Sequence, residues 1–256
     1  MVRSNPGWIR PLNEVARPAA RVVCLPHSGG SATSYSAWAT VMPPDVELLA
    51  VQYPGRGDRC AEPLMGSIGE MSAHIAAQLL RLTSDDPAPY ALFGHSLGAM
   101  VAYETALVLR DRGCPPAYLF VSGSAAPGER RSLLTHRATD EELWSSVCAL
   151  GGIDPAIAQN PELRELVLPA LRADVRAGEL YRPAPQVRPL PCPVRCYHSP
   201  EDPLTRDVDM SAWAARTTGP FSTRERPGGH FHLWIDTDEL VGDILSAVPR
   251  RTTSAA

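Results

Sequence analysis

The sequence predicts an α/β domain with a mostly parallel central sheet, because short apolar runs alternate with longer stretches of helical periodicity. Each run is bounded by Gly, Pro, Ser or Asp, the residue types that end strands. Alternating strands and helices produce βαβ units, whose helices cover both faces of a parallel sheet. We assign five runs to buried strands: Arg21–Leu25, Glu47–Gln52, Tyr90–Gly94, Tyr118–Ser122 and Val194–Tyr197.

Three helices are expected around these strands. Ser67 is the N-cap of the first, and Glu70 three residues later completes a capping box. The apolar residues between Ile68 and Leu82 then recur at helical spacing and form one face. Leu97–Arg112 is the second helix, ended by a glycine with two prolines beyond it, and Asp238–Val248 is the third.

The stretch from residue 127 to residue 185 breaks the alternation, because it contains helical patterns without a clear strand. Thr139 and Glu142 form a second capping box, and a glycine pair ends that helix. Asn160 opens another helix that runs to about Leu180. A helical insertion between two strands of a sheet predicts a lid.

Length and composition favour one globular domain spanning residues 1–256. Apolar residues make up 44% and charged residues 20%, which excludes a disordered tail, a collagen and a coiled coil. The net charge of −4 provides no basic surface for nucleic acid and no attraction to an anionic membrane. With no membrane helix and no apolar leader in view, we expect a cytoplasmic protein. The tails, Met1–Pro18 and Arg250–Ala256, are expected to be loosely ordered.

The six cysteines indicate neither a metal site nor another cofactor site. Cys192 and Cys196 have three residues between them and no second pair at zinc-ligand spacing. In a reducing compartment, the cysteines inside apolar runs are interpreted as small buried hydrophobic residues.

Gly94–Gly98 matches the G-x-S-x-G pattern in the setting that this motif requires, directly after a strand and at the start of a helix. Side chains at positions 94 and 98 would collide with neighbouring backbone. The turn therefore holds Ser96 in a strained conformation with its hydroxyl exposed, and the helix N-terminus favours negative charge there. We predict that Ser96 is a nucleophile; the alternative is an ordinary serine in a tight turn.

A serine nucleophile needs a base, and in this fold the order along the chain is serine, acid, histidine. His230 and His232 are the histidines that fit this order best. We favour His230 because it directly follows the pair Gly228-Gly229, and expect His232 to pack beside Trp234 or to form a local hydrogen bond.

The acid is expected between the last predicted strand and these histidines. Asp202 lies just past the C-terminal end of that strand, where open α/β sheets place functional loops. Glu201, Asp207 and Asp209 remain alternatives.

An oxyanion hole needs two backbone N–H groups, one of them from Leu97, which follows the nucleophile. The second is predicted to be that of Ser28, in the loop 26–31 after the first strand, where two glycines allow close approach to a substrate. A plain glycine turn is an alternative. A phosphate-binding loop is disfavoured because the G-K-[ST] ending is absent.

Five blocks of residues together resemble the type II (discrete) thioesterases that serve polyketide and nonribosomal peptide synthases. They stand in the right order and at the right separations between about Arg21 and Val248. The blocks are Pro26–Gly30, Tyr53–Arg59, Gly94–Ala99, Glu201–Pro203 and Pro227–Phe231.

The resemblance implies an α/β-hydrolase fold with a helical lid and hydrolysis of acyl groups from the phosphopantetheine arm of acyl or peptidyl carrier proteins. It also suggests a monomer. Carried over by block, Ser96, Asp202 and His230 form the triad, with Ser28 and Leu97 donating to the oxyanion. Arg130 and Arg131 are candidates to meet an acidic carrier protein, although a solvated charge pair is the commoner role of such residues.

The expected chemistry is acyl transfer to Ser96 and then to water, helped by a thiol leaving group whose pKa is about 8.5. Three other functions remain open: a carboxylesterase acting on small oxoesters, an acyltransferase that uses the same triad, and a carrier-binding scaffold without activity.

Overall fold

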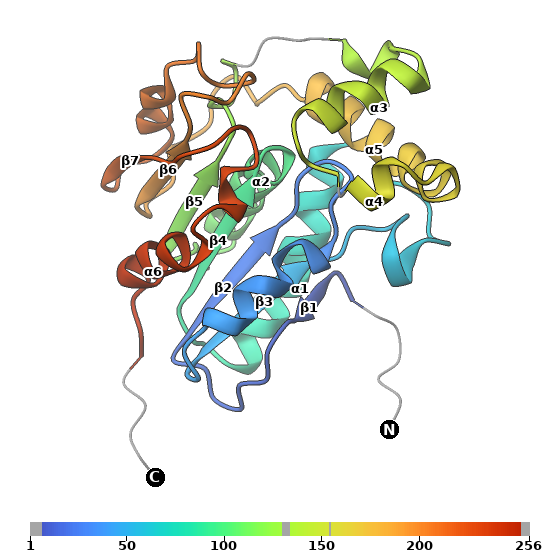
Figure 1. The fold of residues 1–256 in the computed structure, drawn as a ribbon. Helices are drawn as coiled ribbons and strands as arrows, with labels where there is room; N and C mark the ends of the chain where they lie inside the picture. The colour runs from blue at the N-terminus through green and yellow to red at the C-terminus, as the bar shows by residue number, and fades with distance from the viewer. Residues whose placement is uncertain (1–6, 130–133, 154, 252–256) are drawn as a thin grey trace.

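The computed structural model describes residues 7–129, 134–153 and 155–251, which form a seven-stranded sheet with helices on both faces (Figure 1). The strand order is β1-β3-β2-β4-β5-β6-β7; β1 is antiparallel to β3, and every other neighbouring pair is parallel. The strands are β1 (Ile9–Pro11), β2 (Ala20–Leu25), β3 (Val46–Val51), β4 (Tyr90–His95), β5 (Tyr118–Ser122), β6 (Val194–His198) and β7 (Phe221–Glu225).

Alternate residues of the central strands supply two separate cores. In β2, Val23 and Leu25 face the core formed with helices α1 (Ile68–Asp85) and α2 (Leu97–Asp111). Val22 and Cys24 of the same strand face the opposite core. A buried strand that is apolar throughout is the pattern of a parallel sheet covered on both sides, and each fully buried side chain of this kind contributes roughly 1.5–3 kcal/mol.

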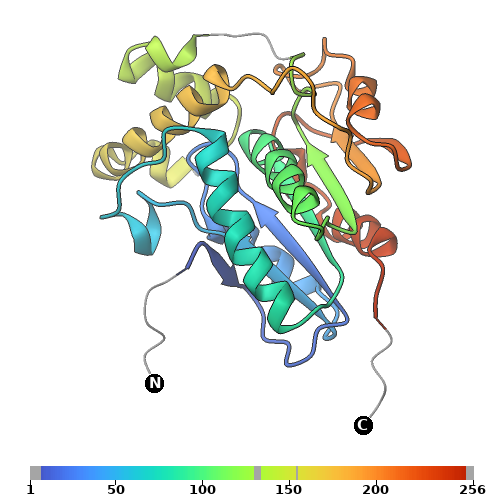
Figure 2. The same cartoon turned by 180° about the vertical axis from the view of Figure 1, so that it is seen from behind.

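The second core is covered by the 3-10 helix η1 (Ala32–Val41) and by α6 (Thr237–Ala247). Viewed from behind, α1 and α2 lie in front of the sheet, whereas η1 and α6 lie beyond it (Figure 2). The predicted mostly parallel α/β architecture is therefore confirmed. No helix within the described residues is long and apolar enough to cross a membrane.

Two strands and part of the tails differ from the sequence-based expectation. β1 pairs with β3 inside the segment expected to be loose, and β7 adds an edge beyond β6. At the other end, the Arg251 N–H donates to the Ala19 carbonyl, and its guanidinium binds Asp86. The prediction of loose tails is thus wrong for these described parts; residues 1–6 and 252–256 lie outside them.

The two predicted capping boxes are realised to different extents. The Ser67 hydroxyl accepts the Glu70 N–H, but the Glu70 carboxylate accepts from Gly66 instead of Ser67, so the first box is half formed. Thr139 and Glu142 form the complete reciprocal box at the start of α3 (Asp140–Ala149).

The predicted helical insertion lies between β5 and β6 and consists of α3, α4 (Pro155–Ala158) and α5 (Pro161–Leu180). These helices sit at the C-terminal end of β2, on the side of the molecule opposite β6 and β7 (Figure 1). They carry a small core of their own, formed by Leu143, Trp144, Leu168 and Leu171. Arg130 and Arg131, the candidate carrier contact, lie outside the described residues.

Candidate active site

Ser96 occupies a strained turn between β4 and α2. Its φ of 53° and ψ of −116° are rarely adopted by a residue with a side chain. Tight packing forces this geometry: a Cβ at Gly94 would lie 2.1 Å from the Gly98 carbonyl oxygen, and one at Gly98 would lie 2.0 Å from the Leu25 carbonyl oxygen. The predicted steric reason for both glycines is confirmed. Ser96 is half-buried, whereas the residues on either side of it are buried, so its side chain is accessible.

His230 and Asp202 form a buried pair in the loops that follow β7 and β6. Nδ1 of His230 lies 2.8 Å from Oδ2 of Asp202, and both residues are almost inaccessible, at 2% and 0% exposure. The carboxylate also accepts the Leu204 N–H and the Thr205 hydroxyl, at 2.9 and 2.8 Å. Burial raises the pKa of Asp202, but the hydrogen bonds and the charge of His230 outweigh burial, so its pKa is lowered.

The His230 ring lies against the turn that carries Ser96. Its centroid is 5.0 Å from that of His95, the residue preceding Ser96. A Cβ at Gly123, beyond the end of β5, would lie 3.4 Å from Cε1 of His230. Asp202 and His230 are thus held beside the C-terminal ends of β4 and β5, the end of the sheet at which Ser96 lies.

His232 belongs to a separate buried network centred on Ser122. The Ser122 hydroxyl lies 3.1 Å from Nε2 of His232 and 3.0 Å from Nδ1 of His95. All three residues are fully buried. Burial, followed by the charge of His230, lowers the pKa of His232 to about 4, and burial lowers that of His95 well below its ordinary value. Both rings are therefore neutral near pH 7.

The expectation that His232 packs beside Trp234 or bonds locally is wrong. Phe231 takes the place beside Trp234, with the two rings stacked at a centroid distance of 4.6 Å. The chain turns at this point, since the His232 N–H donates to the Gly229 carbonyl and residues 232–234 form a 3-10 turn. The turn directs the His232 side chain to Ser122, on a strand distant in sequence. Because Ser122 is enclosed by two histidines, it is inaccessible, unlike Ser96.

The two segments that carry the predicted oxyanion donors begin at the ends of adjacent strands. Leu25 and Gly94 are paired in the register of β2 and β4, so the loop containing Ser28 and the turn containing Leu97 start side by side. Within the described residues, neither the Ser28 N–H nor the Leu97 N–H has a hydrogen-bond acceptor. The next N–H, that of Gly29, donates to Asp174 of α5 at 2.8 Å. The loop is therefore anchored to α5 at Gly29, the residue directly after the predicted donor Ser28.

A cavity of about 180 Å³ lies between the loop after β2 and the helical insertion. One side of it is polar, with Ser28 and Thr33, and the other side is apolar, with Ile157 and Leu171. The insertion also reaches the residue next to His230, because a Cβ at Gly152 would meet the tip of the Phe231 ring at 2.2 Å. The insertion thus touches the site at two separate places.

The cysteines are divided between core and surface. Cys24 and Cys196, which lie in apolar runs, are buried as expected; Cys192 is also buried, whereas Cys60 is exposed. Within residues 7–129, 134–153 and 155–251, no group of three His, Cys, Asp or Glu side chains is arranged to hold a metal ion.

Two residues close to the site could not be identified from sequence. Asp174 lies on an amphipathic helix, where a charged residue usually faces solvent, and Ser122 ends a buried strand as an unremarkable small residue. Arg56, which binds Asp174, falls inside one of the quoted sequence blocks, but its partner is 118 positions away.

The structure has the features of the α/β-hydrolase class: a mostly parallel sheet, a strained serine between β4 and α2, and an acid and a histidine later in the chain. A family model described as the thioesterase domain matches residues 20–248. The chain therefore belongs to the thioesterase family.

Relatives agree with this assignment along nearly the whole chain. Thioesterase PikA5 of Streptomyces venezuelae is 41% identical over 238 residues, which are 93% of this chain and 84% of that protein. The solved structure of BorB, a type II thioesterase from the borrelidin biosynthetic cluster, matches with a TM-score of 0.85 and 37% identity, covering 94% of this chain and 97% of that one. YbtT, a type II thioesterase from the yersiniabactin NRPS/PKS pathway, matches with a TM-score of 0.81 and 32% identity, covering 95% and 98% of the two chains. The resemblance found in the sequence blocks is confirmed.

Proposed function

We propose that this protein is a type II thioesterase that hydrolyses stalled or aberrant acyl groups from the phosphopantetheine arm of carrier proteins in polyketide or nonribosomal peptide biosynthesis. BorB and YbtT are type II thioesterases of biosynthetic pathways, that of YbtT being an NRPS/PKS pathway, and both match nearly the full chain. The observation that carries the catalytic part is the buried His230–Asp202 pair beside the strained turn of Ser96.

In the first half of the proposed reaction, the Ser96 hydroxyl oxygen attacks the thioester carbonyl carbon while Nε2 of His230 takes the hydroxyl proton. Asp202 accepts the Nδ1–H of His230, which fixes the tautomer and stabilises the imidazolium. The Ser28 and Leu97 N–H groups stabilise the negative oxygen of the tetrahedral intermediate, and one such donor is typically worth about 10²–10³-fold in rate. The carbon–sulfur bond then breaks, and the thiol leaves with the proton from His230.

In the second half, a water molecule attacks the carbonyl carbon of the Ser96 ester. His230 takes a proton from that water and returns it to the serine oxygen as the ester bond breaks. The products are a free carboxylic acid and regenerated enzyme. A thiol with a pKa near ~8.5 departs far more readily than an amine, so protonation of the leaving group is a minor part of the barrier.

The insertion supplies the proposed entry for a thin arm. α3, α4 and α5 lie at the C-terminal end of β2, and the cavity beside Ser28 is enclosed partly by their apolar side chains. Contacts with the carrier protein and its arm, remote from the thioester, can lower the barrier at the reacting carbon. The proposal includes a monomeric cytoplasmic enzyme without a cofactor of its own.

The test compares one acyl group on a carrier protein with the same acyl group on a small thiol. We expect kcat/KM to be higher for the carrier-bound form. Equal values would favour the carboxylesterase alternative. Transfer of the acyl group to an added alcohol or amine in preference to water would indicate the acyltransferase alternative.

A further inference from the structure

We propose that Asp174, on helix α5 of the insertion, is a positioning residue that fixes the oxyanion loop formed by residues 28–30. The inference rests on the proposed function, because it assigns Asp174 to the same oxyanion hole. It makes α5 a part of the catalytic framework in addition to a cover over the site.

The first evidence is a direct contact between α5 and the loop. Oδ2 of Asp174 accepts the Gly29 N–H at 2.8 Å, and Asp174 is fully buried. Gly29 has a φ of +75°, a left-handed conformation that glycine adopts readily. A Cβ at Gly29 would lie 3.2 Å from Cδ1 of Leu171, one turn earlier on α5. The loop is therefore in both polar and apolar contact with this helix.

The second evidence is the way in which the carboxylate is itself held. Both Nη atoms of Arg56 bind Asp174, with Nη2 at 2.9 Å from Oδ1, in a two-pronged ion pair. Nη1 of Arg56 also donates to the Gly30 carbonyl at 3.3 Å. Arg56 and Asp174 thus fix two consecutive residues of the loop, one through its N–H and the other through its C=O.

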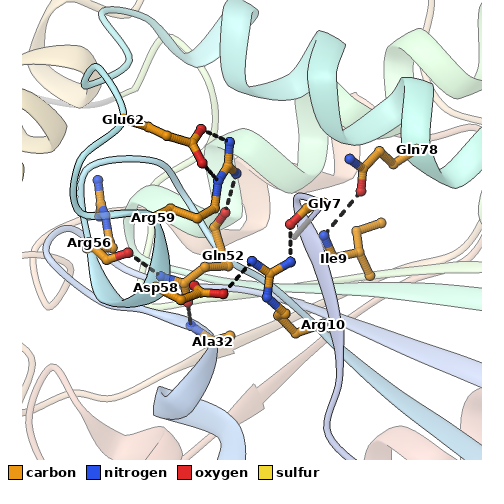
Figure 3. A network of polar contacts seen from close by, with 10 residues as sticks. All are labelled: Gly7, Ile9, Arg10, Ala32, Gln52, Arg56, Asp58, Arg59, Glu62 and Gln78. Carbon is orange, nitrogen blue, oxygen red and sulfur yellow. Dashed lines mark hydrogen bonds and ion pairs between the residues drawn. The ribbon is translucent and has the colours of Figure 1, made fainter. Parts of the chain in front are cut away.

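The third evidence is a contact between Arg56 and Gln52, the residue that directly follows β3. The side-chain amide of Gln52 donates to the Arg56 carbonyl and accepts the Ala32 N–H, both at 2.9 Å. Figure 3 shows Gln52 between these two residues, beside Arg59, which donates to the Gln52 carbonyl at 2.8 Å. Hydrogen bonds therefore join residues 52–59 to one another and to Ala32, and the Arg56 side chain extends from this segment to Asp174.

The chemical consequence follows from the peptide geometry of the loop. The Gly29 N–H belongs to the peptide unit that starts at Ser28, so fixing it limits rotation on the C-terminal side of Ser28. The Ser28 N–H must point at the position of the oxyanion, and a misplacement of about 1 Å can reduce a rate by about 10²-fold. The side-chain hydrogen bonds of Asp174 within the described residues go to Gly29 and Arg56, so it acts through this loop.

The test uses two double variants that both remove the buried charges. Arg56→Gln with Asp174→Asn keeps a side-chain oxygen that can accept the Gly29 N–H, whereas Arg56→Met with Asp174→Leu keeps only the volume. Replacing a buried ion pair by apolar residues of similar size is often tolerated, so the Met/Leu pair is expected to fold. The Gln/Asn pair is expected to fold because its side-chain amides can still hydrogen-bond to each other and to the loop. Asp140→Asn is the matched control, because Asp140 is an exposed ion-pair partner of Arg172 within the same insertion.

We expect the Gln/Asn pair to keep kcat within about 5-fold of wild type, and the Met/Leu pair to lose about 10²-fold in kcat with KM nearly unchanged. A trifluoromethyl ketone, which places an oxyanion in the hole, should lose affinity for the Met/Leu pair by a similar factor. Asp140→Asn should match wild type in both measurements.

A Met/Leu pair with native thermal stability and kcat within about 3-fold of wild type would overturn the proposal. So would an equal, large loss in both pairs, because the acceptor would then be irrelevant. If the Met/Leu pair does not fold, Arg56→Leu with Asp174→Val replaces it. All rates are also measured on a p-nitrophenyl ester. Absence of carrier thioesterase activity in wild type would refute the proposed function alone. The ratios between the variants on the ester would still test the role of Asp174.

Discussion

Nε2 of His232 lies 3.1 Å from the Ser122 hydroxyl, while the ring of His230, two positions earlier, pairs with Asp202. The two histidines of the same loop thus have different partners and different surroundings. Only His230 is joined to a carboxylate that can orient it and stabilise its charged form.

His230→Ala should therefore lower kcat by about 10³-fold or more, since Ser96 loses its base. His232→Ala should lower kcat by at most about 10-fold, a barrier change of roughly 1.4 kcal/mol, because it disturbs packing around Ser122. Steady-state kinetics on both variants checks this, with circular dichroism to confirm folding. The reverse ranking would transfer the role of base to His232.

Ser96→Ala and Ser96→Gly should both prevent formation of an acyl-enzyme, because each lacks the attacking oxygen. Intact-mass spectrometry with a slowly hydrolysed acyl thioester tests this. An acyl adduct that persists on Ser96→Ala would disprove the assignment.

The same two variants should differ in stability. Ser96 has a φ of 53°, which glycine adopts without strain and alanine does not. Ser96→Gly should therefore be more stable than Ser96→Ala by about 1 kcal/mol or more. Urea denaturation of the pair measures the difference; equal stability would show that the turn stores no strain at this residue.

The glycine at position 98 should not tolerate a side chain. Gly98→Ala places a Cβ against the Leu25 carbonyl oxygen, which is backbone and cannot rotate away. We expect a loss of about 3 kcal/mol or more in the free energy of unfolding, or failure to fold.

Gly242→Ala is the control for that substitution. Gly242 lies inside α6 with no atom within 4 Å of an added Cβ, so alanine should stabilise the helix by about 0.5–1 kcal/mol. Thermal unfolding of both variants separates a steric effect from a general response to Gly→Ala. A small effect at position 98 would contradict the packing described for the turn.

Buried histidines should make stability depend on pH in the acid range. Burial, followed by the charge of His230, lowers the pKa of His232 to about 4 and that of His27 to about 3, whereas both titrate near ~6.5 when unfolded. Between these values the unfolded chain binds more protons, so the free energy of unfolding falls as pH falls from ~6.5 towards ~4. Above ~6.5 their contribution is complete and constant.

His232→Gln should reduce this slope, by at most about 1.4 kcal/mol per pH unit. Urea unfolding of wild type and variant at pH 5 to 8 tests it, and the region above pH 7, where the two curves should run parallel, is the internal reference. Parallel curves below pH 6.5 as well would show that His232 is not held neutral by the fold.

The parts of the fold that the sequence predicted are those with a local physical cause. β2 and β4 are continuous apolar runs, and the Ser96 turn follows from glycines whose side chains would collide with backbone. β1 and β7 carry no comparable pattern: β1 spans three residues, and β7 is a half-exposed polar segment, Phe221–Glu225. β1 forms because it pairs with β3, and β7 forms because it pairs with β6. Both pairings depend on residues distant in sequence.

The residues of the candidate site likewise divide into those that sequence patterns predicted and those that only the folded chain brings together. Chain order limited the acid and the histidine to a few candidates; the strand end before Asp202 and the glycine pair before His230 selected these two, and the structure brings them together. Asp174 could not be predicted, since a carboxylate on a helix is normally solvated and only the folded chain places Arg56 and Gly29 beside it. The partner of His232 was missed because the 3-10 turn after Gly229 changes the direction of that side chain.

The two ends of the sheet have a consequence for association between copies of the chain. An edge strand exposes unpaired N–H and C=O groups to which another strand can add. β1 offers only three residues and contains Pro11, which has no N–H, while β7 places Arg224 and Glu225 on exposed positions. Growth of the sheet by strand addition from a second copy, a common route to aggregation, is therefore obstructed at both edges.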